Sequence, residues 1–183
     1  MTPAIFLDRD GTLIELVHHL RDPADIRLIP GAADAVRRFK TAGYRIVIIT
    51  NQSVVGRGML TLEGLADVHE ELVRILARED ICLNGIYFCT ADPAVSGPEG
   101  AEHPDRKPNP GMLRRAAREL DLDLGNSWMI GDSLSDILAG RNAGCAGSIL
   151  VRTGYGCEVD PEEEAVTLVA DDLSHAVDLL PGQ

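Results

Sequence analysis

The chain has 183 residues, and 17 lysines and arginines against 29 aspartates and glutamates give it a formal net charge of −12. Apolar residues make up 45% and charged residues 25%, which is typical of a water-soluble globular protein. Such acidity disfavours sequence-independent nucleic-acid binding, which needs a basic surface. No apolar run approaches the roughly 20 residues of a membrane span, and no secretory signal is recognisable. We therefore expect a cytoplasmic, monomeric protein without nucleic-acid or membrane partners.

Six short apolar segments predict strands, and the amphipathic segments between them predict helices. The predicted strands cover residues 4–8, 44–50, 86–89, 128–131, 148–151 and 167–170. The predicted helices cover residues 31–42, 61–78, 109–120, 133–142 and 173–180. Thr61 and Asn109 are expected to be N-caps, with Pro110 in the first turn of its helix. Residues 90–108 are rich in proline and glycine and show no periodicity, which indicates an irregular loop.

The alternation of strands and helices predicts an α/β fold with a mostly parallel sheet. The strands are continuously apolar, which is typical of a sheet covered by helices on both faces. We therefore expect one three-layer, Rossmann-like domain over residues 1–183, without a large cap domain and with the loop at 90–108 rimming the site. In such folds ligands bind beyond the carboxyl ends of the strands.

Several segments bring polar side chains to that rim of the predicted sheet: Asp8, Asp10, Thr50, Lys107, Asp132 and Asp136. Each of these residues alone is an ordinary turn, cap or surface residue. Together, the carboxylates would repel one another unless a hard divalent cation with oxygen ligands lay between them. A metal ion, a lysine and a hydroxyl can neutralise a transferring phosphoryl group. One carboxylate can act as nucleophile and another as general acid and base. The pattern thus predicts a phosphoryl-transfer site.

These segments resemble the haloacid dehalogenase-like phosphatase superfamily. The resemblance rests on four main motifs: FLDRDGTL (6–13), TNQSVVGRG (50–58), RKPNPGML (106–113) and SWMIGDSLSDILAGRNAGC (127–145). Within the superfamily, the chain is most similar to the group of D-glycero-D-manno-heptose 1,7-bisphosphate phosphatases and histidinol-phosphate phosphatases.

The resemblance implies a role for each motif residue. Asp8 would be the nucleophile and Asp10 the general acid and base. Thr50 and Lys107 would bind the transferring phosphoryl oxygens. Mg²⁺ would be held by Asp8, the backbone carbonyl of Asp10 and Asp132. Asp136 would lie next to these ligands without binding the metal directly. The positions that match substrate contacts in the family are Asn51, Gln52, Ser53 and Arg106. His18 and His19 are candidates for the mouth of the substrate site, or else exposed loop histidines.

Two departures from the family pattern bear on substrate and metal. Residues 16–19 read Leu-Val-His-His where the heptose enzymes carry an Asp-His-Gly-Tyr-like stretch, so the sugar pocket is altered. Relatives commonly hold a structural zinc with cysteine and histidine ligands in the loop before the Arg-Lys pair. Here only Cys89, His103 and Asp105 stand at ligand positions, and Ala91 replaces the fourth. We therefore expect Mg²⁺ and no structural zinc.

The expected function is that of a Mg²⁺-dependent phosphomonoesterase acting on a small sugar bisphosphate, with D-glycero-D-manno-heptose 1,7-bisphosphate as the leading substrate. The alternatives are a histidinol-phosphate phosphatase and a catalytically silent binding protein on the same fold. Removal of 3′-phosphates from nucleic-acid ends is a third alternative, which the charge of −12 disfavours.

Overall fold

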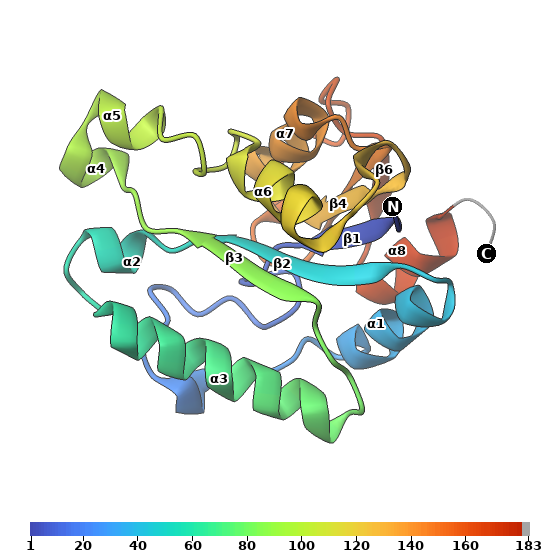
Figure 1. Ribbon diagram of the computed structural model, residues 1–183, viewed down its shortest axis with the longest axis horizontal. Coiled ribbons are helices and arrows are strands. Elements are labelled where there is room, and N and C mark those ends of the chain that lie inside the picture. Colours follow the sequence, from blue (N-terminus) through green and yellow to red (C-terminus); the bar gives the residue numbers. More distant parts are fainter. Residues whose placement is uncertain (181–183) are drawn as a thin grey trace.

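The computed structural model describes residues 1–180 and contains six parallel strands in one sheet, in the order β3-β2-β1-β4-β5-β6 (Figure 1). The strands are β1 (Ala4–Leu7), β2 (Arg45–Asn51), β3 (Gly85–Cys89), β4 (Trp128–Gly131), β5 (Gly147–Val151) and β6 (Leu168–Ala170). The chain builds the sheet outward from β1 to one side and then crosses to β4 on the other side. The predicted α/β fold with a parallel sheet is confirmed, and its topological switch point lies between β1 and β4.

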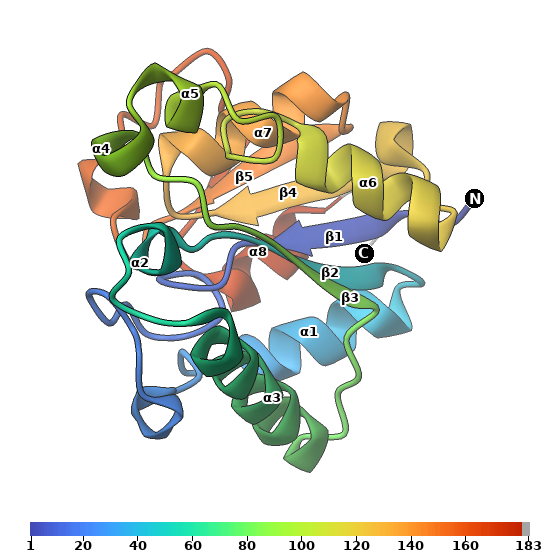
Figure 2. The same cartoon turned by 60° about the vertical axis from the view of Figure 1, so that its left-hand side comes forward.

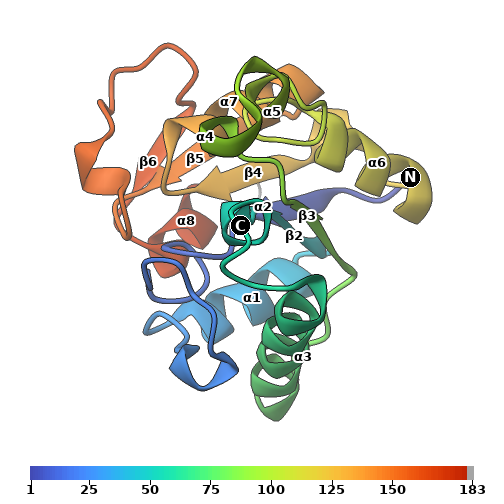
Figure 3. The ribbon, with the colours of Figure 1, turned by 90° about the vertical axis from the view of Figure 1, so that its left-hand side faces the viewer.

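Helices cover both faces of the sheet, which Figure 3 shows from the carboxyl ends of the strands. The helices are α1 (Ala32–Thr41), α2 (Ser53–Gly56), α3 (Leu62–Arg78), α4 (Pro93–Ser96), α5 (Pro98–Ala101), α6 (Gly111–Leu120), α7 (Leu134–Ala143) and α8 (Leu173–Leu179), with short 3-10 helices at Pro23–Asp25, Leu124–Asn126 and Gly156–Glu158. Helices α1, α3 and α8 pack on one face, and α6 and α7 on the other. Within residues 1–180, no helix is long and apolar enough to cross a membrane.

The side chains of β1 show how the two layers are separated. Ile5 and Leu7 are buried in the core on the α1, α3 and α8 side. Ala4 and Phe6 are buried in the second core, on the α6 and α7 side. Successive strand residues point to opposite faces, so a strand buried on both sides needs apolar residues at every position. Burial on both faces of the sheet therefore explains why the strand segments are continuously apolar in the sequence.

The start of α6 differs from the prediction. Pro110, rather than Asn109, is the N-cap, and no side chain caps this helix. The Asn109 amide instead donates to the backbone carbonyls of Ala101 and His103, at 3.3 and 3.0 Å. Asn109 thereby ties the preceding loop together. Thr61, by contrast, is the N-cap of α3 as predicted, and its side chain accepts from the Gly64 N–H.

The prediction that residues 90–108 form an irregular loop is wrong in part, because this segment contains α4 and α5. Each helix has a proline in its first turn, and the Asp92 side chain caps α4 by accepting from the Ala94 N–H. Four residues are too few to show a hydrophobic period, which is why the pattern predicted a loop. The one-turn helix α2 was missed for the same reason. All three helices lie beyond the carboxyl ends of the strands (Figure 2).

Candidate active site

The carboxyl ends of β1 and β4 bring the first and last predicted motifs together. Leu7 pairs with Ile130 in the sheet, and the Asp8 N–H donates to the Ile130 carbonyl at 3.0 Å. This register sets Asp8 beside Asp132, which immediately follows β4. Ligand oxygens of Asp8, Asp132 and Asp136 lie within 4.8 Å of one another. Parallel pairing of the two strands thus produces the carboxylate cluster.

Lys107, in the loop before α6, contacts this cluster and the end of β2. Its Nζ donates to Asp8 Oδ1 at 2.7 Å and to the Ile49 carbonyl at 2.8 Å, and it lies 2.5 Å from Asp136 Oδ1. The lysine is 4% exposed. Burial opposes its charge, but the Asp136 and Asp8 carboxylates outweigh burial and raise the pKa of Lys107. The ammonium is therefore permanently charged and fixed between two carboxylates.

The charges of the cluster are not balanced by protein groups alone. Within residues 1–180, the three buried carboxylates have one lysine among them, Lys107, which pairs with Asp8 and Asp136. Burial raises the pKa of Asp8 to about 8, against the lowering effect of Lys107. Burial and the Asp136 carboxylate raise the pKa of Asp132 to about 6. A divalent cation with oxygen ligands would supply the missing positive charge, so the donor set fits Mg²⁺.

Asp136 owes its position to the start of α7. Ser133 and Asp136 form a capping box, in which each side chain bonds the backbone N–H of the other residue. Asp136 Oδ2 accepts from the Ser133 N–H at 3.1 Å and from its hydroxyl at 2.6 Å. Asp136 Oδ1 faces Lys107. Both oxygens of this fully buried carboxylate are therefore engaged by the protein.

Two glycines make room for Asp132. Gly11 and Gly154 have φ values of +80° and +53°, and a Cβ on either would lie 2.2 or 1.9 Å from Asp132 Oδ2. The same oxygen accepts from the Tyr155 N–H at 2.8 Å. Backbone atoms thus surround the carboxylate on sides where a side chain would displace it.

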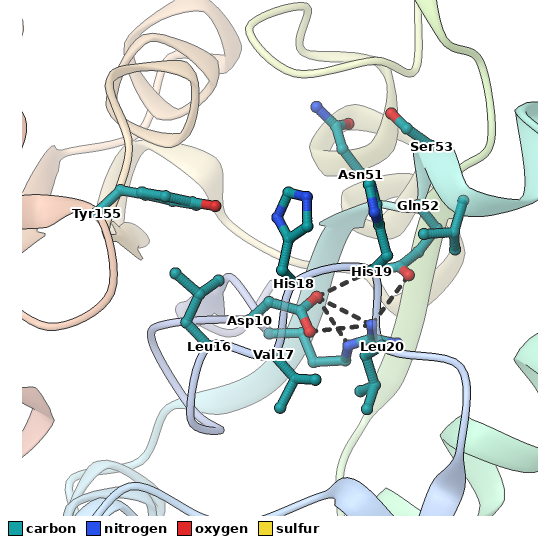
Figure 4. Close-up of a pocket in the computed structure, with 12 residues that line it drawn as sticks. Asp10, Leu16, Val17, His18, His19, Leu20, Asn51, Gln52, Ser53 and Tyr155 are labelled. Carbon is teal, nitrogen blue, oxygen red and sulfur yellow. Dashed lines mark hydrogen bonds and ion pairs between the residues drawn. The ribbon is translucent and has the colours of Figure 1, made fainter.

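Two adjoining hollows open above the cluster. One, of about 220 Å³, is lined by Asp8, Asp10, Leu16, Thr50, Asn51, Lys107, Asp132, Ser133, Ser135 and Tyr155. The other, of about 210 Å³, is lined by Arg9, Asp10, Leu16, Val17, His18, His19, Leu20, Asn51, Gln52, Ser53, Val54 and Tyr155. We call them the inner hollow and the outer hollow. Asp10, Leu16, Asn51 and Tyr155 line both, so the general acid–base candidate borders the two hollows. Figure 4 shows the outer hollow, with Asp10 among its lining residues.

The predicted substrate-contacting residues fall into three groups. His18, His19 and Ser53 line the outer hollow, and the two histidine rings lie against each other, with centroids 3.9 Å apart and planes tilted by 49°. Arg106 lines neither hollow: its Nη1 donates to Ser53 Oγ at 2.9 Å and to the Ala91 carbonyl. Asn51 and Gln52 line the outer hollow but are hydrogen-bonded to neighbouring protein groups.

Sequence reasoning missed two residues of the site. Arg9 is 1% exposed and donates to both carboxylate oxygens of Asp10, at 3.0 and 3.1 Å. Tyr155 lines both hollows and reaches them from the side opposite Asn51 and Ser53 (Figure 4). Tyr155 follows the carboxyl end of β5, so the strand-end rule that found the other residues could also have found it.

The degraded zinc positions are only partly assembled. Cys89 Sγ lies 3.5 Å from His103 Nδ1, and burial raises the pKa of the Cys89 thiol. His103 Nδ1 also accepts from the Asp105 N–H at 3.2 Å, and the Asp105 carboxylate pairs with Arg115. The expectation that no structural zinc is bound stays a prediction.

Comparison with known proteins agrees with this geometry. A family model described as HAD-hydrolase-like matches residues 105–176. The D-glycero-D-manno-heptose-1,7-bisphosphate 7-phosphatase of Thermosynechococcus vestitus is 41% identical, over 96% of this chain and 94% of its own length. The chain belongs to the haloacid dehalogenase-like phosphatases.

Two further similarities support this membership. The D-glycero-beta-D-manno-heptose-1,7-bisphosphate 7-phosphatase of Yersinia pestis is 40% identical, over 89% of this chain and 87% of its own length. A crystal structure of D,D-heptose 1,7-bisphosphate phosphatase from B. bronchiseptica, complexed with magnesium and phosphate, superposes with a TM-score of 0.84 at 32% identity, covering 96% of each chain. The expectation that the protein is an enzyme, and a phosphatase, is confirmed.

Proposed function

We propose that this phosphatase removes the 7-phosphate of D-glycero-D-manno-heptose 1,7-bisphosphate, with Mg²⁺ as cofactor and Asp8 as nucleophile. The observation that carries the proposal is Lys107, which pairs with Asp8 and Asp136 and lines the inner hollow. The substrate follows from the relatives named above, which are 40–41% identical to this chain and are named for that reaction.

The metal would be held by Asp8, Asp132 and the backbone carbonyl of Asp10. When bound, Mg²⁺ would neutralise charge on the transferring phosphoryl group and on the carboxylates around it. Asp136 would not be a direct ligand, because Lys107 and Ser133 engage both of its oxygens. We assign Asp136 to the orientation of Lys107 instead.

The chemistry would proceed in two displacements. A carboxylate oxygen of Asp8 attacks phosphorus, the bond from phosphorus to the sugar oxygen breaks, and Asp10 gives its proton to that oxygen. Asp10 then takes a proton from water, whose oxygen attacks the aspartyl-phosphate and releases phosphate and the Asp8 carboxylate. Lys107 and Thr50, which line the inner hollow, would bind the phosphoryl oxygens throughout.

The outer hollow would hold the rest of the substrate. His18 and His19 line it on one loop and Ser53 on another, and Arg106 donates to the Ser53 hydroxyl. This contact sets a guanidinium group next to the Ser53 end of the hollow. We assign the second phosphate to that end, since guanidinium groups bind phosphate through paired donors.

The test is phosphate release from a panel of esters, with Mg²⁺ and with EDTA. The panel contains both anomers of heptose 1,7-bisphosphate, fructose 1,6-bisphosphate, histidinol phosphate and an aryl phosphate. We expect one heptose anomer to have a kcat/KM orders of magnitude above the other esters, and EDTA to abolish its turnover. A preference for histidinol phosphate would refute the proposed substrate and leave the site chemistry standing. Undiminished turnover in EDTA would refute the metal dependence.

A further inference from the structure

Gln52 follows Asn51 at the end of β2 and is almost completely buried, at 4% exposure. Its Oε1 accepts from Arg9 Nη2 at 2.9 Å. Its Nε2 donates to Asp10 Oδ2 at 3.0 Å and to Thr50 Oγ1 at 2.8 Å. Both N–H groups of the amide are therefore used within the protein, although the residue lines the outer hollow.

The partners of Gln52 fix the orientation of its amide. A guanidinium group can only donate hydrogen bonds, so the acceptor oxygen of the amide must lie opposite it. Oε1 must therefore face Arg9, and Nε2 must face Asp10. It follows that Thr50 Oγ1 accepts a hydrogen bond from Gln52. The single hydrogen of the Thr50 hydroxyl is then left for another acceptor, and Thr50 lines the inner hollow.

The same amide fixes the carboxylate of Asp10. Arg9 Nε donates to Asp10 Oδ2 at 3.0 Å, Arg9 Nη2 donates to Oδ1 at 3.1 Å, and Gln52 Nε2 adds a third bond at Oδ2. Arg9 is itself buried and bonded to Gln52, so these three side chains form one network. A network in which each member is bonded to the others restricts the rotamer of every member.

We propose that Gln52 is a positioning residue, which holds the Asp10 carboxylate and directs the Thr50 hydroxyl hydrogen towards the transferring phosphoryl group. This role replaces the substrate contact that the family resemblance implies for Gln52. It rests on the proposed function for the roles of Asp10 and Thr50. Its consequence is that Gln52 affects every phosphate ester alike, whatever the body of the substrate.

The first experiment measures the inhibition constant of inorganic phosphate in wild type, Gln52→Met, Thr50→Val and the double variant. An inhibition constant does not depend on the fraction of folded enzyme, so a loss of folded protein alone would leave it unchanged. We expect Gln52→Met and Thr50→Val each to raise it about tenfold, which corresponds to ~1.4 kcal/mol. If Gln52 acts through Thr50, the double variant binds phosphate no more weakly than Thr50→Val alone.

Additive losses in the double variant, or an unchanged inhibition constant in Gln52→Met, would overturn the inference. An unchanged constant in Thr50→Val would instead refute the proposed role of Thr50 itself. The two failures are therefore distinguishable.

The second experiment compares the preferred sugar bisphosphate with glycerol phosphate, which has an alcohol leaving group but no sugar ring and no second phosphate. We expect Gln52→Met to lower kcat/KM for both esters by the same factor, of about 10–100. A larger loss for the sugar bisphosphate alone would restore the substrate-contact role and overturn the proposal. Gln52→Glu keeps the shape and the contact to Arg9 but cannot donate, so we expect it not to rescue activity.

Discussion

The side-chain amide of Asn51 exchanges two hydrogen bonds with the backbone of Lys107: Nδ2 donates to the carbonyl and Oδ1 accepts from the N–H, each at 3.1 Å. The two residues are 56 positions apart. The first follows Thr50 on β2, and the second carries the ammonium group that meets Asp8. The amide thereby fixes the loop before α6 to the end of the strand, so that Lys107 reaches the carboxylate cluster.

Asn51→Ala should therefore impair catalysis by more than its effect on stability suggests. We expect it to lower the free energy of unfolding by about 1–2 kcal/mol and kcat/KM by about tenfold through misplacement of Lys107. The matched control is Asn109→Ala, which also removes an amide bonded to two backbone groups of the same loop, but not to Lys107. Equal losses of activity in the two variants would contradict the prediction.

Lys107→Met should leave the buried carboxylates without their cation. Removing one partner of a buried ion pair costs about 3–5 kcal/mol, and we expect a loss of that size in urea unfolding with EDTA present. Adding Asp136→Asn should recover part of the stability, because Asp136 lies 2.5 Å from the ammonium group. Activity should stay absent in both variants. A double variant no more stable than Lys107→Met would show that charge repulsion is not the cause.

Asp8→Asn should abolish turnover and also change how stability depends on pH. Burial raises the pKa of Asp8 from 3.8 to about 8 in the folded protein. Between these values the folded state binds more protons at this site than the unfolded state, so Asp8 lowers stability progressively as pH rises. In EDTA, the unfolding free energy of Asp8→Asn relative to wild type should therefore increase from pH 4 to pH 8 and then level off. A difference that does not vary with pH would contradict the pKa shift, and turnover by the variant would refute covalent catalysis.

Asp10→Asn should lower kcat by about 10²–10⁴-fold, the usual contribution of a general acid–base. The amide keeps the size of the side chain but can neither give nor take the proton. We expect the variant to bind inorganic phosphate nearly as wild type does, since Asp10 is not assigned to the phosphoryl oxygens. A wild-type kcat would remove Asp10 from the mechanism.

Gly154→Ala should destroy the acidic site, because the new Cβ would lie 1.9 Å from Asp132 Oδ2. We expect weaker binding of Mg²⁺, and a loss of kcat/KM of about a hundredfold through displacement of Asp132. Gly58→Ala is the matched control: its φ is +69° and nothing lies within 4 Å of the added Cβ. That variant should show only the left-handed backbone cost, ~1–2 kcal/mol. Similar activity in the two variants would contradict the conclusion that Gly154 makes room for Asp132.

The strand ends could be predicted from the sequence because one rule governs them. The carboxyl ends of parallel strands meet at one edge of the sheet, so residues as distant as Asp8 and Asp132 are brought together once the strands are identified. The apolar strands are easy to identify because both faces of the sheet are buried.

The hydrogen-bond partners of individual side chains could not be predicted in this way. Arg9 bonds Asp10 and Gln52 rather than water only because the chain packs over it. Asn109 bonds loop carbonyls instead of capping α6. Arg106 contacts Ser53 and Ala91 outside both hollows. These choices depend on side-chain packing, which neither periodicity nor motif spacing specifies.

The two glycines that make room for Asp132 have one more consequence. Gly11 lies near the beginning of the chain and Gly154 near its end, and the Thr153 hydroxyl joins them by donating to the Gly11 carbonyl at 2.6 Å across 142 positions. The acidic site is therefore complete only when the segments that follow β1 and β5 have both docked beside Asp132. Phosphate release can therefore serve as a readout of how these two distant segments dock in any variant that keeps the catalytic groups.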